Sequence, residues 1–230
     1  MAEHPVGPAK LRLWDHLEWT LPFLVFLGFL IVGPRLPVGP ALEGAIRVGV
    51  LALVIWAASG RVLDFRVTRL VGSVMVGIGV FFIWIGPDLL IPGHRGHWLL
   101  QNPITGDVGS SVTEAAQVDT VALLFRALRA ILIVPIVEEL FWRGWMLRWA
   151  VNPHFTRVPL GTVTPAAFIA TAVLFATEHG PYWDVGLAAG VAYNLWIMRT
   201  RCLGDLILAH AVTNACLFAY VLATGRWEYL

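Results

Sequence analysis

Charged side chains are scarce in this 230-residue chain, at 13% of the sequence, about half the share found in soluble domains. Basic and acidic residues almost cancel, which leaves a net charge of +1, and the basic residues are scattered singly along the chain. A nucleic-acid partner needs a clustered basic face, so the sequence excludes this class.

Cysteine is scarce as well. Cys202 and Cys216 lie in or beside apolar runs and show no paired spacing. This pattern excludes a disulfide framework and a metal-binding cysteine knuckle, and both side chains are expected to pack in the protein interior.

Hydrophobic residues, in contrast, make up 58% of the chain, and the mean hydropathy is +0.73. Apolar runs near the roughly 20 residues that a helix needs to cross a bilayer predict an all-α, polytopic transmembrane helix bundle of about seven spans. The spans are expected near residues 17–32, 45–59, 70–91, 121–150, 164–178, 185–198 and 203–223. We divide the chain into an N-terminal transmembrane region with an aqueous loop (1–119), a core that carries the motifs on its four spans (120–224) and a tail (225–230).

The distribution of basic residues predicts the orientation of this integral membrane protein. With the N-terminus inside, nine basic residues fall on inner segments and three on outer ones, which agrees with the positive-inside rule. The inner set is Lys10, Arg12, Arg61, Arg66, Arg69, Arg148, Arg157, Arg199 and Arg201, and the outer set is Arg35, Arg95 and Arg226. We expect a cytoplasmic N-terminus and a location in the bacterial inner membrane.

The fourth apolar run contains three charges, Glu138, Glu139 and Arg143. An ionisable side chain near the centre of a transmembrane helix costs about 2.5–3.5 kcal/mol, so these groups need to pair or to reach water. The spacing of four predicts that Arg143 neutralises Glu139, which leaves Glu138 free to face a cavity, accept a proton and activate water. Pro135, three residues before Glu138, predicts a kink that frees backbone carbonyls toward that cavity.

Two later spans carry polar groups four residues apart, which places each pair on one helix face: Phe175 with His179, and His210 with Asn214. Taken singly, each histidine fits a hydrogen bond between helices. Together with Glu138 on a third helix, they define a candidate site. One geometric difficulty is that a fully crossing fifth span would bring His179 closer to the outer side than Glu138, so this span needs a tilt or a deeper start.

The span at 185–198 contains a G-x-x-x-G pattern, with Gly186 and Gly190 one helical turn apart. Such a pattern lets two helix backbones approach closely. We expect it to serve packing within the bundle.

The motifs E-E-x-x-x-R, F-x-x-x-H and H-x-x-x-N, in this order, resemble the CAAX-protease and bacteriocin-processing family, which is related to the type II CAAX prenyl endopeptidases. The resemblance covers about residues 121–223 and implies an intramembrane endopeptidase, that is, a hydrolase. It implies that Glu138 and His179 activate water and that His210 and Asn214 stabilise the oxyanion. The implied supporting residues are Glu139, Arg143 and Phe175.

The family has also been described as metal-dependent, and Glu138, His179 and His210 would suit a catalytic zinc with an open position. Asn214 is a poor zinc ligand, and the two histidines lack the H-E-x-x-H spacing that places two ligands on one helical turn. The expectation is therefore no cofactor, with a divalent metal such as zinc as the alternative.

The expected partners are the lipid bilayer and a membrane-attached protein or peptide substrate. The resemblance implies prenylated CAAX proteins for eukaryotic relatives, and peptide processing or self-immunity for bacterial ones, and no feature of the sequence selects between them. Two other functions stay open: a non-catalytic membrane immunity or chaperone protein, and a proton-coupled transporter, because buried acidic and basic groups also build proton relays. The sequence predicts no oligomeric state.

Overall fold

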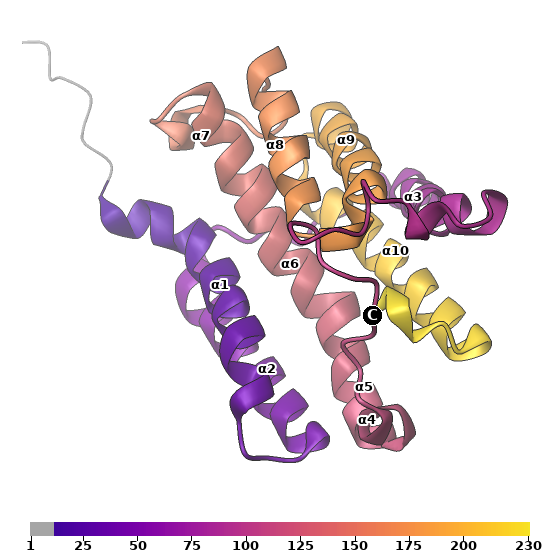
Figure 1. The fold of residues 1–230 in the computed structure, drawn as a ribbon. Coiled ribbons are helices and arrows are strands. Elements are labelled where there is room, and N and C mark those ends of the chain that lie inside the picture. The colour runs from indigo at the N-terminus through magenta and orange to yellow at the C-terminus, as the bar shows by residue number, and fades with distance from the viewer. Residues whose placement is uncertain (1–11) are drawn as a thin grey trace, which may run out of the picture.

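The computed structural model describes residues 12–230, so the first part of the N-terminal region, including Lys10, lies outside the described residues. Within them the protein is a bundle of helices, as predicted, without a β-strand (Figure 1). The α-helices are α1 (Leu13–Val32), α2 (Pro40–Val54), α3 (Leu70–Leu90), α4 (Glu114–Val118), α5 (Thr120–Leu128), α6 (Val134–Glu139), α7 (Leu147–Val151), α8 (Pro165–Thr177), α9 (Trp183–Thr200) and α10 (Leu203–Thr224).

Five helical segments of the described chain are long and apolar enough to cross a membrane, where the sequence predicted about seven. They are Leu13–Arg35, Pro40–Ser59, Leu70–Leu90, Thr120–Val151 and Leu203–Thr224. The difference lies in α8 and α9. Helix α8 has 13 residues, too few to cross the hydrocarbon core, and α9 carries the polar residues Asp184, Asn194 and Arg199.

The short length of α8 resolves the difficulty over the position of His179. The chain leaves α8 after Thr177 and turns through Gly180–Tyr182 into α9, which packs back against α8. Gly180 adopts a left-handed conformation with φ 54°, which favours glycine. His179 therefore lies on a turn beside Glu138 and not at the end of a complete span.

The segment Thr120–Val151 runs through the middle of the bundle as one long helical path (Figure 1). It contains two π-helical stretches, Arg129–Ile133 and Leu140–Met146, which flank α6 on both sides. Each π-helical stretch changes the face that the following residues present, and such irregularities are frequent at functional sites. The two glutamates at the end of α6 thus lie in a short α-helical segment between the two π-helical stretches.

Pro135 removes one backbone donor from the helix, while the kink that the sequence predicts there stays a prediction. A π-helical turn needs an N–H donor five residues after each carbonyl, and proline has none, so the Ala130 carbonyl loses its partner in the helix. Asn214 Nδ2 on α10 donates to this carbonyl at 2.7 Å. The proline therefore links a freed backbone carbonyl to one of the candidate site residues.

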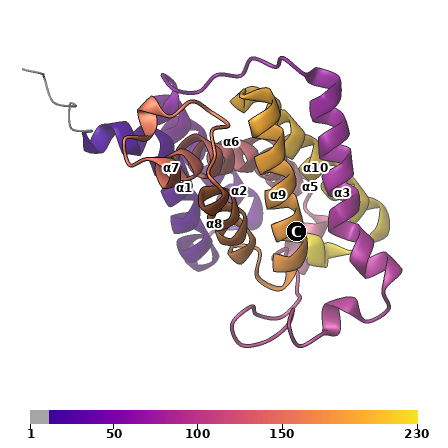
Figure 2. The same ribbon diagram turned by 90° about the horizontal axis from the view of Figure 1, so that it is seen from above.

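Close helix contacts hold the bundle around α10, which packs against α3, α6 and α9 (Figure 2). At Gly77 on α3, an added Cβ would collide with the Ala209 carbonyl of α10, so glycine permits this approach. Gly190 on α9 also lies close to α8, because a Cβ there would come within 3.2 Å of the Ala172 carbonyl oxygen. The G-x-x-x-G pattern thus packs helices within the bundle, as predicted.

Asp205, fully buried near the start of α10, fastens the connection between α2 and α3 to this helix. Its carboxylate accepts hydrogen bonds from the backbone N–H groups of Thr68, at 2.9 Å, and Arg69, at 2.8 Å. The Thr68 hydroxyl donates to the second oxygen at 2.5 Å. One side chain therefore fixes the entry into α3.

We expect Asp205→Ala to destabilise the protein by roughly 2–3 kcal/mol, because the substitution leaves buried backbone donors without an acceptor. Thermal unfolding in detergent micelles measures this effect. Asp64→Ala, which removes an exposed carboxylate from the same connection, is the matched control and should change the unfolding temperature little. Equal unfolding temperatures for the two variants would contradict the assigned role of Asp205.

Candidate active site

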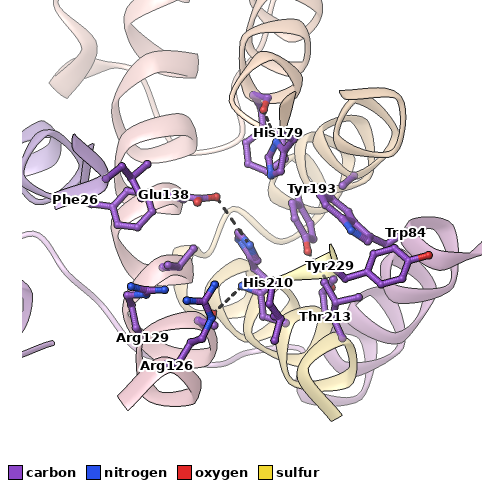
Figure 3. A pocket seen from close by; sticks show the side chains of 18 residues that line it. Phe26, Trp84, Arg126, Arg129, Glu138, His179, Tyr193, His210, Thr213 and Tyr229 are labelled. Carbon is purple, nitrogen blue, oxygen red and sulfur yellow. Dashed lines mark hydrogen bonds and ion pairs between the residues drawn. The ribbon is translucent and has the colours of Figure 1, made fainter. Parts of the chain in front are cut away.

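A cavity of about 220 Å³ opens inside the bundle, and its walls include residues of α1, α3, α5, α6, α8, α9 and α10 (Figure 3). The four residues to which the resemblance assigns catalytic roles all line it: Glu138, His179, His210 and Asn214. Phe175 lines it too, while Glu139 and Arg143 lie behind the wall. Tertiary packing has thus brought the three sequence motifs to one place.

Glu138 occupies α6 and is 6% exposed. Its Oε2 atom is buried and has no hydrogen-bond partner among the described residues. His210 Nε2 lies 3.9 Å from this oxygen, too far for a hydrogen bond (Figure 3). A buried carboxylate oxygen without a partner is costly, so this atom is suited to accept a hydrogen bond from a molecule in the cavity.

Glu139 and Arg143 form the predicted ion pair, and both side chains are fully buried. Arg143 Nη1 donates to both carboxylate oxygens, at 3.2 and 3.1 Å. Its remaining donors reach Asn194 Oδ1 at 3.0 Å and the Gly190 carbonyl at 3.2 Å, both on α9. The guanidinium also lies over the ring of Phe175, 4.5 Å from the centroid. A buried ion pair needs such additional contacts to offset the free-energy cost of removing its charges from water.

Glu139 has a second contact that the sequence did not reveal: its Oε1 lies 2.8 Å from His210 Nδ1. Because both oxygens of this carboxylate accept from Arg143, we assign Oε1 as the acceptor here as well and Nδ1–H of His210 as the donor. The hydrogen bond turns His210 Nε2 toward Glu138. The ring of Tyr193 stacks on the imidazole, with centroids 5.0 Å apart, and so fixes its plane.

His179 is oriented in the same manner. Its Nδ1 lies 2.8 Å from the backbone carbonyl of Phe175, and since a carbonyl only accepts, Nδ1 carries the proton. The neutral ring then presents Nε2 as an acceptor. Trp84 of α3 packs edge-on against it at 5.1 Å, and a Cβ at Gly186 of α9 would approach the ring to 3.1 Å. Three helices therefore restrict the orientation of this imidazole.

Asn214 lies one helical turn beyond His210 on α10, as the spacing of four predicts. One amide hydrogen is used by the Ala130 carbonyl. The structure gives the rest of this side chain no hydrogen bond within residues 12–230, and it lines the cavity. A second N–H is thus available to a molecule bound there.

For Glu178 the sequence leaves two interpretations open, a partner of the adjoining His179 or a solvated helix end. Its Oε1 accepts a hydrogen bond from Trp142 Nε1 at 2.9 Å, and its carboxylate lies in a group with Glu138 and His179 whose potential ligand atoms are all within 4.8 Å of one another. A glutamate at a helix end is ordinary in a sequence, and its adjacency to His179 was the sole available signal. Trp84 and Tyr193 also come from spans without a catalytic motif.

The group of Glu138, Glu178 and His179 bears on the metal alternative. Two carboxylates and an imidazole are suitable zinc ligands. This set differs from the expected one, because Glu178 takes the place of His210, which instead hydrogen-bonds Glu139. The absence of a cofactor remains a prediction.

The described chain is thus a polytopic bundle of apolar, membrane-length helices, and one cavity inside it gathers carboxylates and imidazoles. Residues 120–216 match the family model described as Type II CAAX prenyl endopeptidase Rce1-like, in agreement with the resemblance that the motifs carry. At the level of the family, the match supports a CAAX-type intramembrane protease. No curated protein and no solved structure matches the chain.

Proposed function

We propose that this protein is an intramembrane endopeptidase that hydrolyses a peptide bond in a membrane-attached protein or peptide. The observation that supports the proposal most is that Glu138, His179, His210 and Asn214, from three separate helical segments, line one cavity inside the bundle. The orientation with a cytoplasmic N-terminus in the bacterial inner membrane is part of the same proposal and is supported by the distribution of basic residues.

In the proposed reaction, a water molecule donates hydrogen bonds to Glu138 Oε2 and His179 Nε2, both of which are free to accept. Glu138 takes a proton as the water oxygen attacks the carbonyl carbon of the substrate. When the tetrahedral intermediate collapses, the C–N bond breaks and Glu138 returns this proton to the leaving amine. The two products are a new carboxylate and a new amino group.

The oxyanion of the tetrahedral intermediate is stabilised by His210 and Asn214. Because Nδ1–H of His210 is used by Glu139, donation from Nε2 requires the doubly protonated imidazolium. The adjacent carboxylate of Glu139 stabilises that cation, as the buried aspartate of a serine-protease triad does for its histidine. The free N–H of Asn214 is the second donor.

Cleavage of a membrane-anchored reporter library by purified protein in liposomes tests the proposal. In water enriched in ¹⁸O, the new carboxylate of each product is expected to gain one heavy oxygen atom, which mass spectrometry detects. If no reporter is cut and the protein instead drives proton-coupled uptake into liposomes, the transporter function replaces the peptidase.

The proposal is free of a metal step, because Glu178 is already bound by Trp142 and His210 by Glu139. We therefore expect chelators of divalent metals to leave cleavage within about twofold of the untreated rate, since catalytic metals contribute several kcal/mol. Loss of cleavage with chelator and its recovery with added zinc would show that Glu138, Glu178 and His179 hold a metal.

A further inference from the structure

Three arginines gather in a second cavity next to the candidate active site. This cavity measures about 350 Å³, and Arg47, Arg126 and Arg129 line it together with a single carboxylate, Glu43. Arg126 and Arg129 line the active-site cavity as well, so their side chains form a wall between the two. The reaction proposed above does not use either of them.

The positive charges in this cavity exceed the negative ones. Arg47 is paired with Glu43 and also donates to the Phe29 carbonyl at 3.3 Å. Arg126 donates to the hydroxyl of Ser111, which is neutral. The side chain of Arg129 lines the cavity and has neither a hydrogen bond nor an ion pair with any residue of the described chain. Two guanidinium charges thus stay uncompensated beside an apolar span, where an ionisable group is costly without a counter-charge.

The second cavity extends to the ends of three membrane-length segments. Its lining includes Gly33 and Pro34, which follow α1, and Pro40, which starts α2. Arg126 and Arg129 lie about 9 and 14 Å along the helix from its start at Thr120. Both line the same cavity as these helix ends, which connects their side chains to the level of the headgroups. Lipid phosphates lie at the ends of the spans, just outside the hydrocarbon core.

Apolar side chains complete the cavity, among them Leu30, Leu36, Val38 and Leu123. A site for a free inorganic anion has no need of such a lining. A phosphate ester that carries an acyl chain would contact both the arginines and the apolar walls. The combination therefore matches the two halves of one amphipathic molecule.

We infer that this second cavity binds an anionic phospholipid, with its phosphate on Arg126 and Arg129 and an acyl chain along Leu30 and Leu123. Guanidinium groups are suited to phosphate because their donors match two phosphate oxygens at once. The bound lipid lies against side chains that also line the active-site cavity, so it couples membrane composition to that cavity. This inference goes beyond the proposed hydrolysis and does not depend on it.

Lipid binding is measured by native mass spectrometry and by thermal unfolding in micelles, with phosphatidylglycerol, phosphatidylcholine or inorganic phosphate added separately. Wild-type protein is expected to retain phosphatidylglycerol and to gain stability from it in preference to phosphatidylcholine. Each of Arg126→Gln and Arg129→Gln should weaken phosphatidylglycerol binding about tenfold, the loss typical of one charge-assisted hydrogen bond. Arg35→Gln is the control, because Arg35 follows α1 at the same end of the bundle but does not line the cavity.

The possible outcomes distinguish a lipid phosphate from free inorganic phosphate, and a lipid from a peptide. Equal stabilisation by inorganic phosphate and by phosphatidylglycerol would overturn the lipid site in favour of a free anion site. A different result would assign the arginines to the peptide substrate instead. In that case both glutamine variants bind lipid as wild type does, but they cleave reporters that end in a free carboxylate less well than the matching amides. Because binding is measured without turnover, failure of the peptidase proposal leaves this test intact. Arg129→Lys keeps the positive charge and should retain part of the lipid binding. This variant therefore distinguishes loss of the charge from loss of the fold.

Discussion

Glu138→Gln is expected to abolish cleavage while the protein stays folded. Glutamine has the shape of glutamate and still accepts a hydrogen bond from water, but it cannot take up the proton that the attack releases. Positioned general bases typically contribute about 10²–10⁴-fold to the rate, and we expect a loss of this size in kcat. The measurement is the turnover of the best reporter in liposomes, at matched amounts of folded wild-type and variant protein.

Glu178→Gln is the matched control for this prediction, because Glu178 lies in the same group of side chains but already accepts a hydrogen bond from Trp142. Under the metal-free reaction we expect a loss below about tenfold, the effect of a weakened hydrogen bond. Equal losses in the two variants would favour a shared metal. A Glu138→Gln protein that still supports the cellular phenotype, while neither it nor wild type cuts any reporter, would favour the immunity or chaperone function.

Arg143→Met is expected to cause the largest loss of stability. The substitution removes the guanidinium that neutralises Glu139, and both side chains are fully buried. Removal of one partner from a buried ion pair typically costs about 3–5 kcal/mol, because the other charge stays behind without compensation. Asn194 Oδ1 and the Gly190 carbonyl also lose their donor. Thermal unfolding in micelles measures the loss.

The double variant Glu139→Gln/Arg143→Met separates the charge from the packing. If the uncompensated carboxylate is the main cost, the double variant should be more stable than Arg143→Met alone, which a double-mutant cycle detects. Arg157→Met, at an exposed position, serves as the control for the substitution itself. A stability of Arg143→Met within about 1 kcal/mol of that control would show that the pair does not hold this part of the bundle.

The sequence determined the helical class of this protein and the contacts within single helices. Apolar runs of membrane length predict helices because lipid leaves backbone groups no other partners. The same-face spacing of four correctly paired Glu139 with Arg143 and placed His210 and Asn214 on one face of α10. These features depend on the spacing of residues along a single helix, which can be read directly from the sequence.

Contacts between helices were decided by the tertiary structure alone. The proximity of Glu178 to Glu138, the hydrogen bond from His210 to Glu139 and the stacking of Tyr193 on His210 all join residues from different helices. Within residues 12–230, five helical segments have the length and composition of a membrane span, where the sequence predicted about seven spans. The turn at Gly180 folds α9 back against α8 and brings His179 beside Glu138. Helix length, register and close approach depend on how the whole bundle packs, and no local pattern encodes them.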